Sequence, residues 1–212
     1  MPGSFSQSGF IDRIVRLRGF ENLRMGFLDQ PPQLPRLIDL LLDDNVGYLK
    51  PWLEIGVDVF LHHGDIRSQK GLIFNPQIFR QFLKSADKAL FRIARAAGTH
   101  LWYSPDGNLL EIVDDLAECG VSMHDPQAGA ATLDGSQRRS LGRRCALGDL
   151  DEQRLPFCSP PEINEQTREA VEKPATPTGG LKIFAIHRHD IRLENTEAVL
   201  VGWEQHCFHH WP

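Results

Sequence analysis

The chain has 212 residues, 41% of them hydrophobic, and a formal net charge of −5, which fits a single globular domain with a sizeable core. The sequence contains no stripe of basic residues with interleaved aromatics, no apolar run long enough to span a bilayer and no signal-peptide pattern at its start. We therefore expect a cytoplasmic protein whose partners include neither nucleic acid nor membrane.

Helical patterns dominate the first half of the chain. Apolar residues have mixed spacing over Phe10–Leu28, which predicts a loop and a short helix. Over Gln33–Ile55 they recur at three- and four-residue steps, which predicts an amphipathic helix that Gly56 ends. An Asn-Pro start predicts a further long helix over Asn75–Ala97.

Three shorter helices and the cysteines complete the local reading. The helices are expected over Asn108–Glu118, Ser159–Glu172 and Glu194–Gln205. The four cysteines form no Cys-x-x-Cys pair, so we expect reduced thiols, with Cys119 and Cys145 in the core, and no metal site built from them. The acidic residues of one helix are expected to form a solvated face. They are Glu111, Asp114, Asp115 and Glu118.

Short β-type runs alternate with these helices, and acidic or imidazole side chains follow each run. Strand–helix alternation predicts a parallel sheet, and ligands of such sheets bind outside the carboxyl ends of the strands. The expected strands are Val57–Leu61, Leu101–Tyr103, Val121–His124, Cys145–Leu147 and Lys182–Ile186.

The number of units limits the architecture. Five β/α units, or six if a strand lies near Phe10–Val15, are fewer than the eight of a (β/α)8 barrel, which takes about 250 residues. We therefore predict an α/β fold of the TIM-barrel type, incomplete at its N-terminus and forming one domain over residues 1–212; an open parallel sheet is the alternative. The first strand would have an unpaired edge, which a homodimer contact or a partner chain would cover.

Four segments along the chain also carry a family resemblance. They are Leu17–Leu23; Asp65–Ile73 with Asn75-Pro76; Gly148–Phe157 with Ser159–Ile163; and Asp190 with Glu194-Asn195. In this order and spacing they resemble the uroporphyrinogen decarboxylase superfamily, which also contains cobalamin-dependent methyltransferases. The resemblance implies a (β/α)8 barrel with its active site at the strand carboxyl ends, in agreement with the alternation of strands and helices.

The resemblance also implies a function. It points to a carboxy-lyase for a small tetrapyrrole-type substrate of porphyrin biosynthesis, working by acid–base chemistry without cofactor or metal. Aspartates would hold pyrrole N–H groups, and a histidine would donate the proton that replaces CO2. The expected catalytic residues are Asp65, Asp106 and His187. The expected substrate-binding residues are His63, Arg67, Asp149, Asp151 and His189.

The chain departs from the family pattern in two respects. It lacks the Arg-rich loop and the aspartate that family members carry on their first barrel strands, so substrate carboxylates would depend on Arg67, Arg154 or Arg188. Ala185 falls, in ungapped register, at the place of the family's catalytic histidine, and His187 follows two residues later.

Two other functions stay open. A corrinoid-dependent methyltransferase of the same superfamily would bind zinc through a His-x-Cys pair, where this chain has Ser104 and Asp106. A catalytically inactive fragment or binding module would need a partner that supplies the missing strands.

The candidate residues also have structural interpretations. Asp65 and Asp106 are typical of turns and helix caps. Because adjacent strand residues point to opposite faces, at most one of His62 and His63 faces a site, and the other is a buried core histidine.

Overall fold

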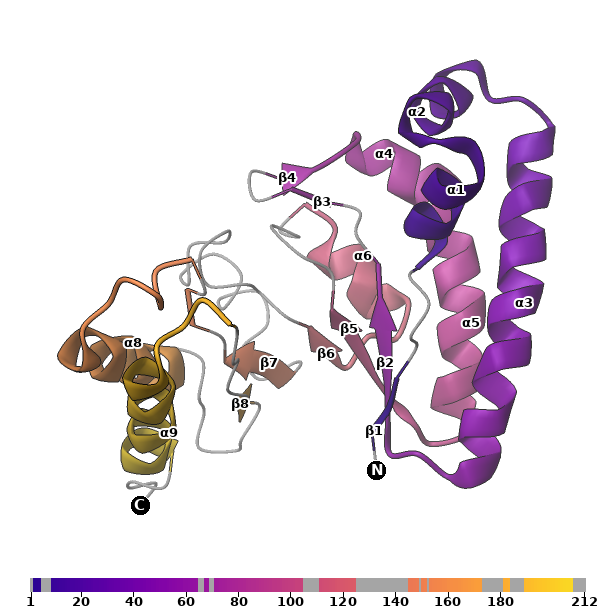
Figure 1. Ribbon diagram of the computed structural model, residues 1–212. Coiled ribbons are helices and arrows are strands. Elements are labelled where there is room, and N and C mark those ends of the chain that lie inside the picture. The colour runs from indigo at the N-terminus through magenta and orange to yellow at the C-terminus, as the bar shows by residue number, and fades with distance from the viewer. Residues whose placement is uncertain are drawn as a thin grey trace. The chain divides into compact units, whose positions relative to one another are not determined.

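The computed structural model describes residues 2–4, 9–64, 67–68, 71–104, 111–124, 145–148, 150–151, 153–172, 181–183 and 189–207. The chain divides into two compact units, Met1–Met123 and His124–Pro212. Both units combine parallel strands with helices, so the α/β prediction is confirmed (Figure 1).

The sheet of the first unit is parallel. Strand β2 (Val59–His63) lies between β1 (Pro2–Ser4) and β5 (His100–Ser104), and β6 (Met123–His124) follows β5 in the strand order. The expected strands after helix Gln33–Ile55 therefore exist, displaced by up to two residues. The additional strand is β1, and the alternative of a strand near Phe10–Val15 is wrong, because helix occupies that segment.

Two helices stand where a loop and a short helix were expected. Helix α1 (Phe10–Arg18) and helix α2 (Phe20–Asp29) are separated by Gly19, whose φ of +80° favours glycine. Each helix buries a face of its own. Ile11 and Ile14 are buried on α1, and Leu23 and Phe27 are buried on α2. Two independent faces joined at a glycine explain why the apolar spacing is mixed.

Helix α3 (Gln33–Ile55) has the predicted bounds. It ends at Gly56, which has φ +80° and donates its amide to the carbonyls of Leu53 and Trp52. The helix packs against α5, and α5 packs in turn against β5, so these two helices cover one face of the sheet (Figure 1).

The long helix expected over Asn75–Ala97 is interrupted. Asn75 caps it as predicted, by accepting a 2.9 Å hydrogen bond from the Gln77 amide. The segment then consists of α4 (Pro76–Ile78), a π-helical turn η1 (Phe79–Leu83) and α5 (Lys84–Ala96). The π turn directs Phe79, Phe82 and Leu83 together into the core. Apolar periodicity does not distinguish such a turn from continuous α-helix.

Two smaller elements complete the first unit. Strands β3 (Arg67–Ser68) and β4 (Gly71–Leu72) form an antiparallel pair that the sequence pattern does not predict. Helix α6 spans Val113–Glu118, and the first residues of the predicted helix Asn108–Glu118 lie outside the described part of the chain.

The second unit is built on a helix pair and two strands. Strands β7 (Cys145–Gly148) and β8 (Leu181–Ile183) are parallel neighbours. Helix α8 (Pro160–Glu172) packs against α9 (Leu193–Cys207), and Gly202 permits the close approach, because a Cβ there would overlap the Thr167 side chain. The predicted helices of this unit and the strand Cys145–Leu147 are confirmed, with boundary shifts of one or two residues. The strand expected over Lys182–Ile186 is confirmed at its start, and its last three residues lie outside the described part of the chain.

The cysteines and the search for membrane spans bear on two expectations. All four cysteines lie in the described residues and are reduced thiols. Cys119 is buried as expected, but Cys145 is only half-buried and Cys158 is buried instead. Within the described ranges, no helix is long and apolar enough to cross a membrane.

Candidate functional site

The carboxyl end of β2 separates two neighbouring histidines. Burial alternates along this strand, so Phe60 and His62 face the helices whereas His63 is exposed on the opposite side. The prediction that at most one of the two histidines is accessible is therefore confirmed.

His62 has the structural role. Its ring lies 5.2 Å from that of Phe91 and 5.7 Å from that of Tyr103, between centroids, and it is 2% exposed. Burial, together with the neighbouring His63, lowers the pKa of His62 to about 3. A ring that stays neutral in the core is suited to packing and not to proton transfer at neutral pH.

His63 is the predicted site residue that the structure places best. Its Nδ1 lies 3.2 Å from the carbonyl oxygen of Ser104, the residue opposite it in register at the end of β5. A carbonyl only accepts, so Nδ1 carries the proton in this contact, and in the neutral ring the lone pair is on Nε2. The contact therefore presents an acceptor nitrogen at the carboxyl ends of two adjacent strands.

Close backbone packing holds this strand end in place. A Cβ at Gly9 would lie 2.7 Å from the His63 carbonyl oxygen and 2.9 Å from Cα of Gly64. A Cβ at Gly64 would lie 3.3 Å from the Tyr103 hydroxyl. Only glycine fits at Gly9, so the segment before α1 and the end of β2 form one tightly packed support for His63.

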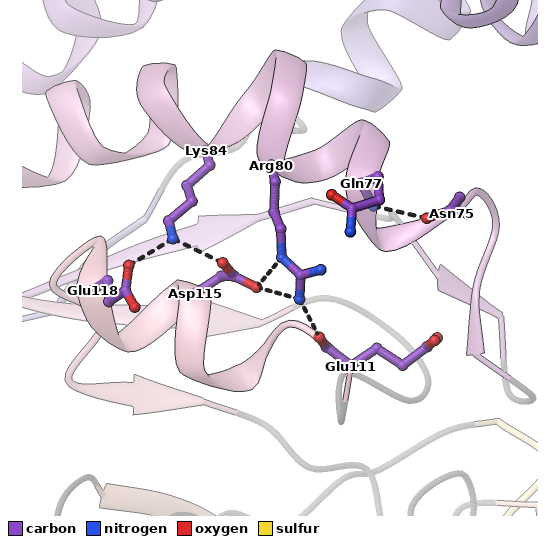
Figure 2. A network of polar contacts seen from close by, with 7 residues as sticks. All are labelled: Asn75, Gln77, Arg80, Lys84, Glu111, Asp115 and Glu118. Carbon is purple, nitrogen blue, oxygen red and sulfur yellow. Dashed lines mark hydrogen bonds and ion pairs between the residues drawn. The ribbon is translucent and has the colours of Figure 1, made fainter.

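A polar network joins α6 to η1 and α5 (Figure 2). Arg80, on the π turn, donates from Nε to Asp115 Oδ2 at 3.0 Å, and its Nη2 forms an ion pair with the same oxygen at 3.0 Å. Lys84 donates to Asp115 Oδ1 at 2.8 Å and to Glu118 Oε2 at 2.6 Å. Arg80 also donates to the Glu111 carbonyl at 3.1 Å, two residues before α6 begins.

This network corrects the expectation of a solvated acidic face. Asp115 is 8% exposed and paired with two cations, because it faces α5 and η1 across the helix layer. Burial acts to raise the pKa of Asp115, but the hydrogen bonds from Arg80 and Lys84 outweigh it and hold that pKa below its usual value. Glu118 and Glu111 remain exposed, as predicted.

In the second unit Asp151 organises a turn. Its Oδ1 accepts a 3.1 Å hydrogen bond from the Gln153 amide, and its carbonyl accepts the amides of Arg154 and Leu155 at 2.9 and 3.1 Å. Asp151 is half-buried, three residues beyond the end of β7. His189, the other described candidate of this unit, is exposed in a turn before α9.

The structure does not test the other candidates. Four of them lie outside the described residues: Asp65, Asp106, Asp149 and His187. Arg67 is described only in its backbone, which pairs in β3 with Leu72 of β4. Their roles stay predictions. Of the predicted site residues, His63 contacts the end of the neighbouring strand β5, and Asp151 begins a hydrogen-bonded turn.

Several supporting residues were missed by sequence reasoning. Arg80 and Lys84 are four residues apart, the spacing that places two side chains on one helix face, but nothing local identifies Asp115 as their partner. Asn195 belongs to a segment used for the family resemblance, and its contacts with a distant turn are visible only in three dimensions.

One groove is formed entirely by described residues of the first unit. It has a volume of about 470 Å³ and lies between α3 and the η1–α5 segment. The lining residues are Gln30, Pro35, Ile38, Asp39, Leu42, Gln81, Phe82, Ser85 and Ala86. None of these is a predicted site residue. Among the described side chains, no group of three or more His, Cys, Asp or Glu residues is arranged to hold a metal ion.

Comparison with known proteins gives the family. The profile described as Uroporphyrinogen decarboxylase (URO-D) matches residues 14–185, well over half of the chain. A search of curated proteins finds no matching relative. The matched range includes the two histidines at the carboxyl end of β2, the polar network and the Asp151 turn. The chain belongs to the uroporphyrinogen decarboxylase family.

Proposed function

We propose that this chain is a carboxy-lyase that acts on a tetrapyrrole-type substrate at the carboxyl ends of its parallel strands. Membership of the uroporphyrinogen decarboxylase family supports the reaction class. The observation that carries the location is His63, exposed at the end of β2 and oriented by the Ser104 carbonyl. Ligands of parallel α/β folds bind at this edge.

The proposed chemistry needs only acid–base groups. Asp65 and Asp106 accept the N–H groups of a pyrrole ring, and His63 and Asp151 contribute to binding. The bond between the side-chain carbon and the carboxylate breaks, CO2 leaves, and the electron pair remains on the carbon. His187 then donates the proton that replaces CO2. Neither metal nor cofactor takes part in this scheme.

The sheet faces support a barrel. The buried sheet side chains that face the helices are Phe60, His62, Leu101 and Tyr103, whereas Leu61 and Trp102 on the other face are only half-buried. Parallel sheets normally have both faces covered. We propose that residues 1–212 form one partial (β/α)8 barrel domain, in which this second face points inward and a second copy or a partner chain completes the barrel.

A product analysis tests the reaction. The purified chain is incubated anaerobically with uroporphyrinogen, and the carboxylates of the product are counted by mass spectrometry after oxidation to the porphyrin. We expect loss of CO2, abolished or strongly reduced by Asp65→Asn, Asp106→Asn or His187→Gln. A folded chain whose product keeps every carboxylate would contradict the proposal.

The same material separates the alternatives. Methyl transfer from methylcobalamin to a thiol, without CO2 release, would favour the methyltransferase. Tetrapyrrole binding without turnover would favour a binding module, and native mass would show whether a partner or a second copy is needed.

A further inference from the structure

The turn between β7 and α8 buries side chains on both sides of an exposed tip. Phe157 is 86% exposed, while Leu155 and Cys158 are 1% and 4% exposed. Backbone carbonyls at buried residues need hydrogen-bond partners, because leaving them unpaired costs about 1–3 kcal/mol each. Among the described residues of the turn, no backbone N–H donates to the carbonyls of Leu155 and Cys158.

Asn195 supplies the missing partners from α9. Its side chain is fully buried, and Nδ2 donates to the Leu155 carbonyl at 2.7 Å and to the Cys158 carbonyl at 2.9 Å. Arg192 NH2 adds a third hydrogen bond, to the Cys158 carbonyl at 3.0 Å. Both amide protons of Asn195 are therefore used on one turn, forty residues away along the chain.

Leu155 connects this anchor with a predicted site residue. Its amide donates to the Asp151 carbonyl at 3.1 Å, and its carbonyl accepts from Asn195 at 2.7 Å. The path from α9 to Asp151 therefore consists of two hydrogen bonds through one peptide residue. The Arg154 amide supports the same Asp151 carbonyl at 2.9 Å.

We propose that Asn195, assisted by Arg192, is a positioning residue that fixes Asp151 beyond the carboxyl end of β7. Asn195 touches no substrate in this account. It acts through the Leu155 carbonyl and the turn that Asp151 begins. The consequence for substrate binding rests on the proposed function, whereas the fixing of the turn does not.

Two matched variants test the structural part. Asn195→Asp keeps the size of the side chain but removes both N–H donors, and turns carboxylate oxygens toward two carbonyls. Asn164→Asp is the control: the Asn164 side chain hydrogen-bonds Gln205 Oε1 at 2.6 Å and His206 Nε2 at 3.1 Å, both on α9. The readout is amide hydrogen exchange of Arg154 and Leu155, whose amides bond Asp151, relative to amides in the middle of α8.

The outcomes separate anchoring from a general loss of stability. We expect exchange at Arg154 and Leu155 to accelerate at least about tenfold in Asn195→Asp, with α8 unchanged and with no acceleration of these two amides in Asn164→Asp. Unchanged exchange in Asn195→Asp, or equal acceleration in both variants, would overturn the proposal. If Asn195→Asp fails to fold, Arg192→Ala removes one of the three hydrogen bonds, and we expect a smaller acceleration of exchange at the same two amides. No acceleration in Arg192→Ala would overturn the proposal.

A double-variant cycle tests the consequence for the site. With uroporphyrinogen as the probe, we expect Asp151→Asn and Asn195→Asp each to raise KM more than they lower kcat. The double variant should be no worse than the poorer single variant. Additive losses would mean that Asn195 acts elsewhere. A wild-type chain that releases no CO2 but shows the exchange result would contradict the proposed function alone.

Discussion

The two units of this chain keep their shape by different means. In the first unit a large apolar cluster joins α1–α3, η1, α5 and the sheet, and it encloses two titratable groups, His62 and Asp87. Among the residues described in the second unit the buried cluster is smaller, and hydrogen bonds from Asn195 and Arg192 to backbone carbonyls hold the turn that precedes α8. In the described residues, a large apolar cluster holds the first unit together, whereas the turn before α8 in the second unit depends on directed hydrogen bonds.

This difference predicts which property of each unit a mutation or a change of pH should affect. Close-packed cores lose several kcal/mol when a large side chain is truncated. A region defined by hydrogen bonds loses less stability per contact, but its geometry changes with a single donor. Mutations in the first unit should therefore change mainly the free energy of unfolding, and mutations of the hydrogen-bonded turn in the second unit should change mainly its local order.

The largest expected effect is in the core of the first unit. Phe91 is fully buried and packs its ring against His62 and Tyr103. Phe91→Ala should lower the free energy of unfolding by about 3–5 kcal/mol, because it removes apolar contacts and leaves a cavity. Urea unfolding measures this, with the exposed Leu28→Ala as a control expected to change stability by less than about 0.5 kcal/mol. Equal losses in both variants would remove the distinction between core and surface.

The next effect depends on pH. Burial raises the pKa of Asp87 from 3.8 to about 8. The folded protein thus holds a proton that the unfolded chain releases, so the wild type loses stability as pH rises from about 4 to about 8. Asp87→Asn stays neutral and should be more stable than the wild type by about 1–4 kcal/mol at pH 7, with the difference disappearing near pH 4. Thermal unfolding at several pH values, with Asp39→Asn as the exposed control, measures it; a difference that does not grow with pH contradicts the assignment.

A smaller loss is expected at the polar network of the first unit. Asp115→Asn removes the charge shared by Arg80 and Lys84 and should cost about 1–2 kcal/mol at neutral pH. The folded pKa of Asp115 is depressed, so this stabilisation is present above its usual value of 3.8 and is lost as pH falls below it. Asp43→Asn, exposed on α3, is the control. High salt should reduce the Asp115 effect only partly, because the carboxylate is mostly buried.

The smallest effect concerns the start of α8. Ser159 donates from its amide and its hydroxyl to Glu162 Oε2, at 2.8 and 2.7 Å, in a capping arrangement. Ser159→Ala should cost less than about 1 kcal/mol. Ser85→Ala, in the exposed part of α5, should be neutral or slightly stabilising because alanine favours helix. If Ser159→Ala lowered the free energy of unfolding as much as Phe91→Ala does, the contrast drawn between the two units would be wrong.

Elements defined by local signals could be predicted from the sequence. Helix α3 has its predicted bounds, since a long apolar period and a terminal glycine are both local. The Asn75 cap and the start of α8 are confirmed for the same reason. The π turn and the break at Gly19 were missed, because periodicity averages over the windows in which they occur.

The candidate site divides in the same way. Strand alternation sufficed to separate His62 from His63. The burial of Asp115 and the anchoring by Asn195 depend on partners more than thirty residues away, and no local pattern encodes such a pairing. Asp65, Asp106, Asp149 and His187 remain sequence-based predictions of site residues.

The most direct test of the account compares two surfaces of the first unit. CO2 release from uroporphyrinogen is measured for the wild type, for His63→Ala at the carboxyl end of β2, and for Asp39→Asn in the groove between α3 and the η1–α5 segment. We predict release by the wild type, a raised KM in His63→Ala and unchanged kinetics in Asp39→Asn. A folded wild type without release, or an effect of Asp39→Asn with none of His63→Ala, would contradict a decarboxylase site at the strand ends.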